Sequence, residues 1–144
     1  MKHGPRWPAA LIVKIHSTGV ELKPVTAIQS STYGGDAHLF GAGNCIDGEV
    51  KDVEGAHGNP SICQTNNNPA PWFAIDYNTS VTVQRVEIFN RPEFGGRTRN
   101  VDVRIANELP TSDSEMFSGG TLFGHFAGPG TDGQHIIILG QTRL

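Results

Sequence analysis

The stretch VQRVEIFNRPEFGGRTRNVDVRI, residues 83–105, contains two strand-like runs with a turn between them. Alternating apolar and polar residues are typical of a strand with one buried face. Pro92 fixes one backbone angle and Gly95-Gly96 can supply positive φ angles, so the stretch predicts a β-hairpin. Apolar residues occupy alternate positions on both sides of the turn: Val86, Ile88, Val101, Val103 and Ile105.

The predicted hairpin would bring three arginines together: Arg91, Arg97 and Arg99. Guanidinium groups held close to one another offer forked donors to a polyol, a carboxylate or a phosphate. The alternative is that these arginines are solvated charges that protect an edge strand from pairing with another chain.

The composition narrows the class of protein. At 144 residues, the chain is expected to form one domain with a single core. Its net charge of −3 and its pI near 6.0 provide no basic surface for nucleic acid or an anionic membrane. The 18 glycines and 9 prolines indicate many turns, and no window has the apolar spacing of an amphipathic helix. We therefore predict an all-β fold.

Further strand-like runs recur along the chain between clusters of Gly, Pro, Asn and Asp. The apolar run ALIVKI, residues 10–15, is too short to span a membrane. We interpret residues 1–19 as a leader or a peripheral strand, and residues 20–144 as the domain. The other predicted strands are residues 27–33, 72–77, 81–89, 100–106, 120–126 and 135–140.

A long polar loop, residues 43–71, contains both cysteines, Cys45 and Cys63. Long loops in compact domains tend to be functional or cross-linked. The two cysteines are well placed for one disulfide in an oxidising compartment, and two buried thiols are the alternative. The glycosylation sequon at residues 78–80 fits a secreted protein, although such triplets are common by chance.

The same loop includes the acidic turn NCIDGE, residues 44–49. Carboxylate and amide oxygens in a turn that contains glycine suit calcium, which prefers hard oxygen ligands. The spacing is not that of an EF-hand, because Lys51 stands where an oxygen ligand is needed. A solvated acidic loop is the alternative.

Seven segments, in order along the chain, resemble the F-type lectins, the fucolectin family that includes eel agglutinin and tachylectin-4-like domains. The resemblance covers roughly residues 20–140. It implies a jelly-roll β-sandwich of the galactose-binding, discoidin-like class, a structural calcium ion, and a shallow cup of loops that binds α-L-fucose. The segments are AIQSSTYGG, NCIDG, SICQT, PWFAIDY, VQRVEIFNR, NVDVRI and GPGTDGQHIII.

The resemblance assigns sugar-binding arginines residue by residue. The first family arginine falls on Arg91, and the second falls on Arg97, with Arg99 as the alternative. Many members have two adjacent cysteines in the turn, which pack on the apolar face of the sugar. This chain has Phe94 there, and an aromatic ring can replace that contact.

The family's sugar-binding histidine has no counterpart after the loop cysteine. This chain has Gln64 and Thr65 in that position. Gln64 can donate and accept hydrogen bonds, but it is a different ligand. His57, earlier in the loop, is the other candidate.

The resemblance also implies how the loop is held. It favours a Cys45–Cys63 disulfide, because the chain lacks the C-terminal cysteine that some members use. The family takes one further calcium ligand from a Glu in a last strand, which the resemblance does not find here. The calcium ligands that it does imply are Asn44, Asp47, Glu49, Ser61 and Ile62.

Catalysis has little support, since the chain contains no G-x-S-x-G, H-E-x-x-H, P-loop or C-x-x-C motif. We interpret the chain as a secreted, calcium-dependent lectin of innate immunity that recognises fucosylated or related glycans. Homo-oligomers would add avidity, and neither nucleic acid binding nor membrane insertion is expected. The alternatives are a protein-interaction module that has lost sugar binding and a glycan-binding accessory domain of a hydrolase.

Overall fold

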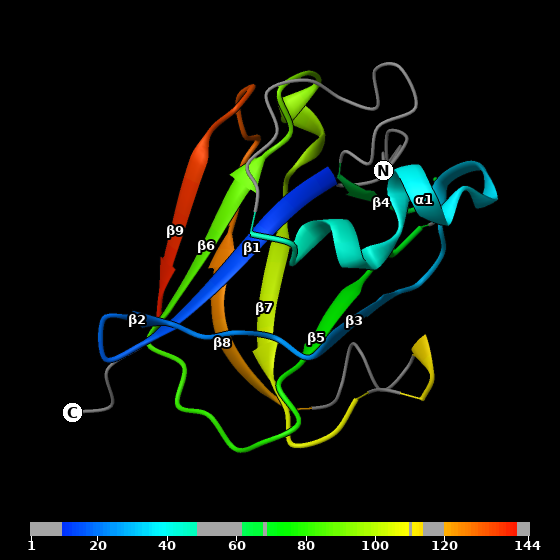
Figure 1. Cartoon of the computed structure of the whole chain (residues 1–144). Coiled ribbons are helices and arrows are strands. Elements are labelled where there is room, and N and C mark those ends of the chain that lie inside the picture. The colour runs from blue at the N-terminus through cyan, green and yellow to red at the C-terminus, as the bar shows by residue number, and fades with distance from the viewer. Residues whose placement is uncertain (1–9, 49–61, 68, 110, 114–119, 141–144) are drawn as a thin grey trace.

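The computed structural model describes residues 10–48, 62–67, 69–109, 111–113 and 120–140 (Figure 1). Strands dominate this part of the chain, and the α-helix α1 (Ala37–Phe40) has only 4 residues. The predicted all-β fold is confirmed. Short 3₁₀ turns are η1 (Tyr33–Gly35), η2 (Ala42–Cys45) and η4 (Gly95–Arg97). The strands are β1 (Ala10–Ser17), β2 (Val20–Glu21), β3 (Thr26–Gln29), β4 (Cys63–Gln64), β5 (Phe73–Asp76), β6 (Arg85–Asn90), β7 (Val101–Ile105), β8 (Thr121–Phe126) and β9 (His135–Leu139).

The described strands form antiparallel sheets around one core. The largest sheet has the order β2-β1-β6-β9, with β4 also paired to β1, while β3 pairs with β5 and β7 pairs with β8. Figure 1 shows β7 and β8 running behind β1 and β6, so the arrangement is sandwich-like. The core lies between these layers. Its residues include Ile15, Val86, Ile88, Ile136 and Ile138 from the large sheet, and Val101, Val103, Phe123 and Phe126 from β7 and β8.

The strand β1 lies inside the large sheet, whereas residues 1–19 were expected to be a leader or a peripheral strand. β1 pairs with β6 on one side and with β2 and β4 on the other. Ile15 is buried in the core and Val13 packs against it, which explains why the apolar run joins the sheet. The predicted boundary between residues 19 and 20 therefore falls in the turn that connects β1 to β2.

The hairpin predicted for residues 83–105 is wrong. β6 pairs with β1 and β9, and β7 pairs with β8, so the two runs belong to different sheets. The positive φ angles of the connection are at Phe94 (59°) and Asn100 (51°), and not at Gly95 or Gly96. Gly95 is required for close packing instead, since a Cβ there would lie 2.3 Å from the main chain of Thr131. Period-2 alternation identifies a half-buried strand but says nothing about its partner.

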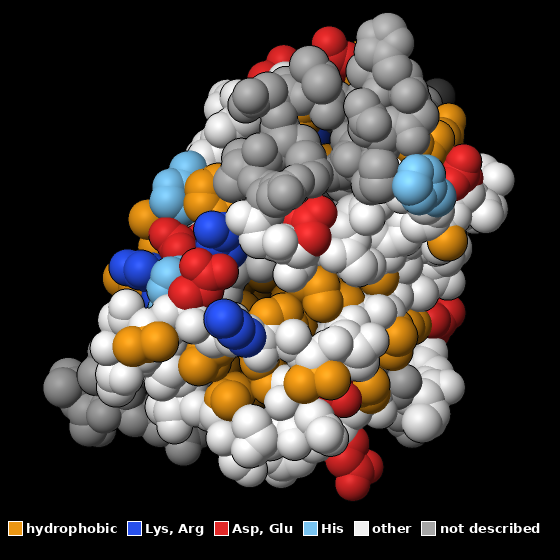
Figure 2. Space-filling view, in the orientation of Figure 1, with side chains coloured by type: hydrophobic (Ala, Val, Ile, Leu, Met, Phe, Trp, Pro, Cys, Tyr) orange, Lys and Arg blue, Asp and Glu red, His pale blue; other side chains and the backbone are white. Residues whose placement is uncertain are grey.

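The outer face of the large sheet is polar at its centre. Figure 2 shows Lys, Arg, Asp, Glu and His side chains gathered over β1, β6 and β9, with apolar side chains among them. Oε2 of Glu87 (β6) contacts Nε2 of His16 (β1). Oε1 of the same carboxylate lies 3.0 Å from Nε2 of His135 (β9). The His135 ring stacks on Phe89, with ring centroids 4.4 Å apart.

Candidate functional site

Strand register brings two of the predicted binding segments to one end of the large sheet. Leu11 of β1 pairs with Cys63 of β4 on one side and with Asn90 of β6 on the other. Two neighbouring strands in a sheet are about 4.8 Å apart, so Cys63 and Asn90 are separated by roughly 10 Å. Gln64 and Arg91 follow these two residues directly. Gln64 and Arg91, which are 27 positions apart in the sequence, thus lie at the same end of the large sheet, on either side of β1.

Arg91, Phe94 and Arg97 form a compact group, called here the Arg–Phe cluster. The guanidinium carbon of Arg97 lies 4.5 Å from the centroid of the Phe94 ring, and that of Arg91 lies 5.6 Å from it. Both distances are within the range of a cation–π interaction. Phe94 nevertheless remains 57% exposed. The cluster therefore offers solvent an aromatic surface with cationic neighbours.

The backbone of Phe94 has an unusual conformation. Its φ and ψ angles, 59° and 34°, are left-handed. Such angles are uncommon in a bulky side chain and cluster at ligand-binding sites, where the surrounding structure imposes them. The N–H of Gly95 donates to Oδ1 of Asp132 at 2.6 Å, which fixes the chain immediately after Phe94. The loop of residues 127–134 therefore helps to hold the Arg–Phe cluster in place through Asp132.

Asn90 is the buried centre of this support. Its Nδ2 donates to the carbonyl oxygens of Gly95 and Thr131, both at 2.9 Å. Its Oδ1 accepts from the N–H of Arg91 at 3.0 Å and from the hydroxyl of Thr98 at 2.7 Å. A buried amide that is satisfied on both sides rigidifies the segments it joins. Asn90 thus ties both ends of the 91–98 segment to the neighbouring loop.

The predicted sugar-binding residues differ in accessibility. Arg91, Gln64 and Thr65 are buried, with exposed fractions of 2%, 5% and 5%. Arg97 is half-buried. Arg99 is exposed, and no ring contact among the described residues involves it, so Arg97 and not Arg99 shares the Phe94 ring with Arg91. His57 lies outside the described residues.

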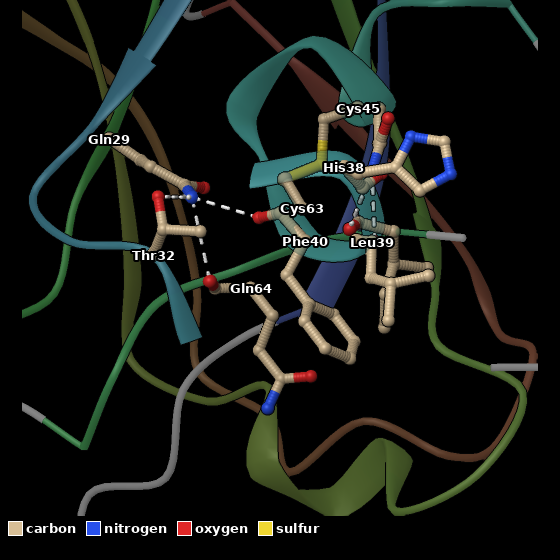
Figure 3. The surroundings of a disulfide bond; sticks show 10 residues. Gln29, Thr32, His38, Leu39, Phe40, Cys45, Cys63 and Gln64 are labelled. Carbon is tan, nitrogen blue, oxygen red and sulfur yellow. Dashed lines mark hydrogen bonds between the residues drawn. A yellow bond between two sulfur atoms is a disulfide. The ribbon is translucent and has the colours of Figure 1, made fainter. Parts of the chain in front are cut away.

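The disulfide between Cys45 and Cys63 is confirmed, and it joins η2 to β4 with a Cα–Cα distance of 5.2 Å. Both cysteines are buried in the core. Figure 3 shows Gln29 beside the bridge, where its Nε2 donates to Thr32 Oγ1 at 3.1 Å and to the Phe40 carbonyl at 2.9 Å. In the same view the Gln64 side chain extends away from the disulfide. The bridge and Gln29 together hold the start of the long polar loop against β4.

The predicted calcium ligands are only partly described, because Glu49 and Ser61 lie outside the described residues. Asn44 Nδ2 donates to the carbonyl of Leu39 at 2.9 Å and approaches that of Ile62 at 3.5 Å. Asn44 and Ile62 are therefore neighbours, which fits an assignment to one site, but the contact between them is a hydrogen bond. Asp47 is exposed. Within the described ranges, no group of three or more His, Cys, Asp or Glu residues could hold a metal ion.

Asn90, Thr131 and Asp132 were not among the residues predicted to form the site. Their contacts join residues about 40 positions apart, and no spacing rule connects them in the sequence. The sequence offered one signal, the Asn that directly precedes Arg91 at the end of a strand-like run.

Comparison with known proteins shows that about half of this chain is similar in sequence to a fucolectin. Over 77 residues, or 53% of this chain, the sequence is 36% identical to Fucolectin-5 of Anguilla japonica. The chain spans 39% of the length of that relative. No protein-family model and no solved structure matches the chain. In the described part of the chain, no helix is long and apolar enough to cross a membrane.

Proposed function

We propose that this chain is a secreted carbohydrate-binding domain of the F-type lectin kind, with a jelly-roll fold, and that it recognises fucosylated or related glycans. The observation that carries the proposal is the Arg–Phe cluster, in which the exposed Phe94 ring lies against the half-buried guanidinium of Arg97 and the buried guanidinium of Arg91. A ring face packs on the apolar side of a pyranose, and guanidinium N–H groups donate to its hydroxyls. The similarity to a fucolectin supports the same ligand class.

The most direct test is a titration of L-fucose and D-galactose against the wild type, Phe94→Ala and Arg97→Ala. Hydrogen bonds to a charged donor contribute about 1.5–3 kcal/mol, so Arg97→Ala should weaken binding by at least about tenfold. Loss of the ring contact should weaken it by roughly fivefold. Arg104→Ala is the matched control, because Arg104 is exposed on β7 and belongs to another part of the surface.

A second candidate function is a protein-interaction module with a lectin-type fold. The burial of Arg91 and Gln64 favours it, since neither side chain is accessible to a sugar in this conformation. Absence of wild-type binding at millimolar sugar would support this candidate and exclude the lectin. Binding that survives both Phe94→Ala and Arg97→Ala would instead assign the sugar to another surface.

Calcium dependence is part of the proposal, with the turn at Asn44 and Asp47 and the Ile62 carbonyl as the described contributors. Calcium would neutralise the acidic loop and hold its carbonyl oxygens in place. We expect chelation to lower the melting temperature, and Asp47→Asn to reduce that response while Asp102→Asn on β7 does not. An unchanged melting temperature in a preparation shown to contain calcium would contradict this assignment.

A further inference from the structure

The strand β9 lies at the edge of the large sheet and has one side of its main chain turned away from β6. The N–H of Asn90 donates to the carbonyl of Gln134 at 2.9 Å, and that of Gly140 donates to the carbonyl of Gln84 at 3.3 Å. In an antiparallel ladder, alternate residues of one strand point their N–H and C=O to the same side. The even-numbered residues from 134 to 140 therefore bond to β6. The main-chain groups of His135, Ile137 and Leu139 point outward.

In the part of the chain that the structure describes, these outward groups have no ladder partner. Among the described residues β9 pairs only with β6, and no hydrogen bond there reaches the main-chain N–H or C=O of His135, Ile137 or Leu139. β8 packs nearby across the core but pairs with β7 instead. An edge of this kind is a template for another strand.

The side chains of β9 do not protect this edge. Ile137 and Leu139 are 52% and 66% exposed. The strand HIIIL has no proline, no lysine and no carboxylate, and its register with β6 has no bulge. The strand β7 has both charges and a bulge, because Asp102 and Arg104 are exposed on it and its pairing shifts between Val103 and Arg104. Charges and bulges are the usual protection of an edge, and β9 lacks them.

We propose that two copies of this chain associate through β9, paired antiparallel about a two-fold axis at Ile137. In this register Ile137 faces Ile137 of the partner subunit, and His135 faces Leu139 of the partner subunit. Every outward N–H and C=O of the three residues then meets a complementary group, as a self-complementary two-fold contact requires. In this register His135 faces the partner's Leu139, so no like charges lie opposite each other, which makes a second copy the occupant that fits the strand. The exposed Ile137 and Leu139 side chains of both copies form one apolar strip along the seam.

The first test is sedimentation velocity over a concentration series, with Ile137→Lys compared to the wild type. The wild type should shift from 15.5 kDa toward twice that mass. Ile137→Lys places two ammonium groups face to face and should weaken the dimer by at least about tenfold. Val20→Lys is the matched control, because Val20 is 62% exposed at the opposite end of the same sheet, and it should leave the dimer intact.

A second variant tests the register itself. Both native cysteines are in the disulfide, so Ile137→Cys would introduce the sole thiol of the chain. Mild oxidation should cross-link it to a covalent dimer on non-reducing electrophoresis, while Val20→Cys should stay monomeric. A wild type that remains monomeric at the highest attainable concentration overturns the proposal. So does a dimer that Ile137→Lys leaves unchanged, or equal cross-linking of the two cysteine variants.

Discussion

The two faces of the large sheet consist of alternate residues of the same strands, yet different forces stabilise them. On the inner face, Val86 and Ile88 are each 2% exposed and pack in the apolar core. Glu87 lies between them in the sequence and points to the other face, where His16, His135 and Arg85 surround its carboxylate. Successive side chains of a strand point to opposite faces of the sheet, so Glu87 makes ion pairs while its two sequence neighbours pack in the core. The inner face should therefore respond to lost volume, and the outer face to pH.

The largest effect is expected at Asn90, where the inner face ends at the candidate site. Asn90→Ala leaves buried donors and acceptors of the 91–98 segment without partners, and each costs about 1–3 kcal/mol. We expect the free energy of unfolding to fall by about 4 kcal/mol in urea denaturation. Asn107→Ala, at an exposed position, should change it by less than about 0.5 kcal/mol. A small effect of Asn90→Ala would show that the 91–98 segment is held by other contacts.

The contrast between the faces is sharpest at two neighbouring isoleucines of β9. Ile136 is 4% exposed and Ile137 is 52% exposed. Ile136→Ala should lower the free energy of unfolding by about 3 kcal/mol, because it removes buried methylene groups and leaves a cavity. Ile137→Ala, measured at a concentration where the chain is monomeric, should cost less than about 1 kcal/mol. Equal costs would mean that the strand register is shifted by one residue.

The smallest effect concerns Glu87 and the pH dependence of stability. Burial alone would raise the pKa of Glu87, but the hydrogen bonds and positive charge of His16, together with Arg85 and His135, outweigh it and lower the pKa below the ordinary value of 4.5. A carboxyl whose pKa is lower in the folded state contributes stability above its unfolded pKa, and this stability is lost as pH falls through the folded pKa.

The test of the Glu87 prediction is Glu87→Gln, compared by urea denaturation at pH 7 and at decreasing pH. The variant should be less stable by about 1 kcal/mol at pH 7, and the difference should shrink in acid. Glu21→Gln is the control, since Glu21 makes an exposed pair with Lys14 at 3.6 Å and should have little effect. A difference that stays constant with pH would show that Glu87 acts through packing and not through its charge.

Local pattern was sufficient to locate most strands of this protein. Alternation in residues 83–105, and strand-like runs between turn residues elsewhere, predicted segments that overlap β3, β5, β6, β7, β8 and β9. The limits of some elements differ, since residues 81–84 lie outside β6 and residues 33–35 form the turn η1. The placement of two cysteines in one loop allowed a Cys45–Cys63 bridge, the family resemblance favoured it, and it is confirmed.

Which strands pair, by contrast, was decided by the tertiary structure. Alternation gave β6 and β7 as neighbours in a hairpin, but burial of their apolar faces in one core places them in opposite layers. The same holds for the candidate site. The sequence supplied Arg91, Phe94 and both possible second arginines, and only the turn η4 and the packing of Gly95 on Thr131 direct Arg97 onto the ring. Side-chain period is a local property of the chain, whereas strand partners and loop packing depend on contacts between residues far apart in the sequence.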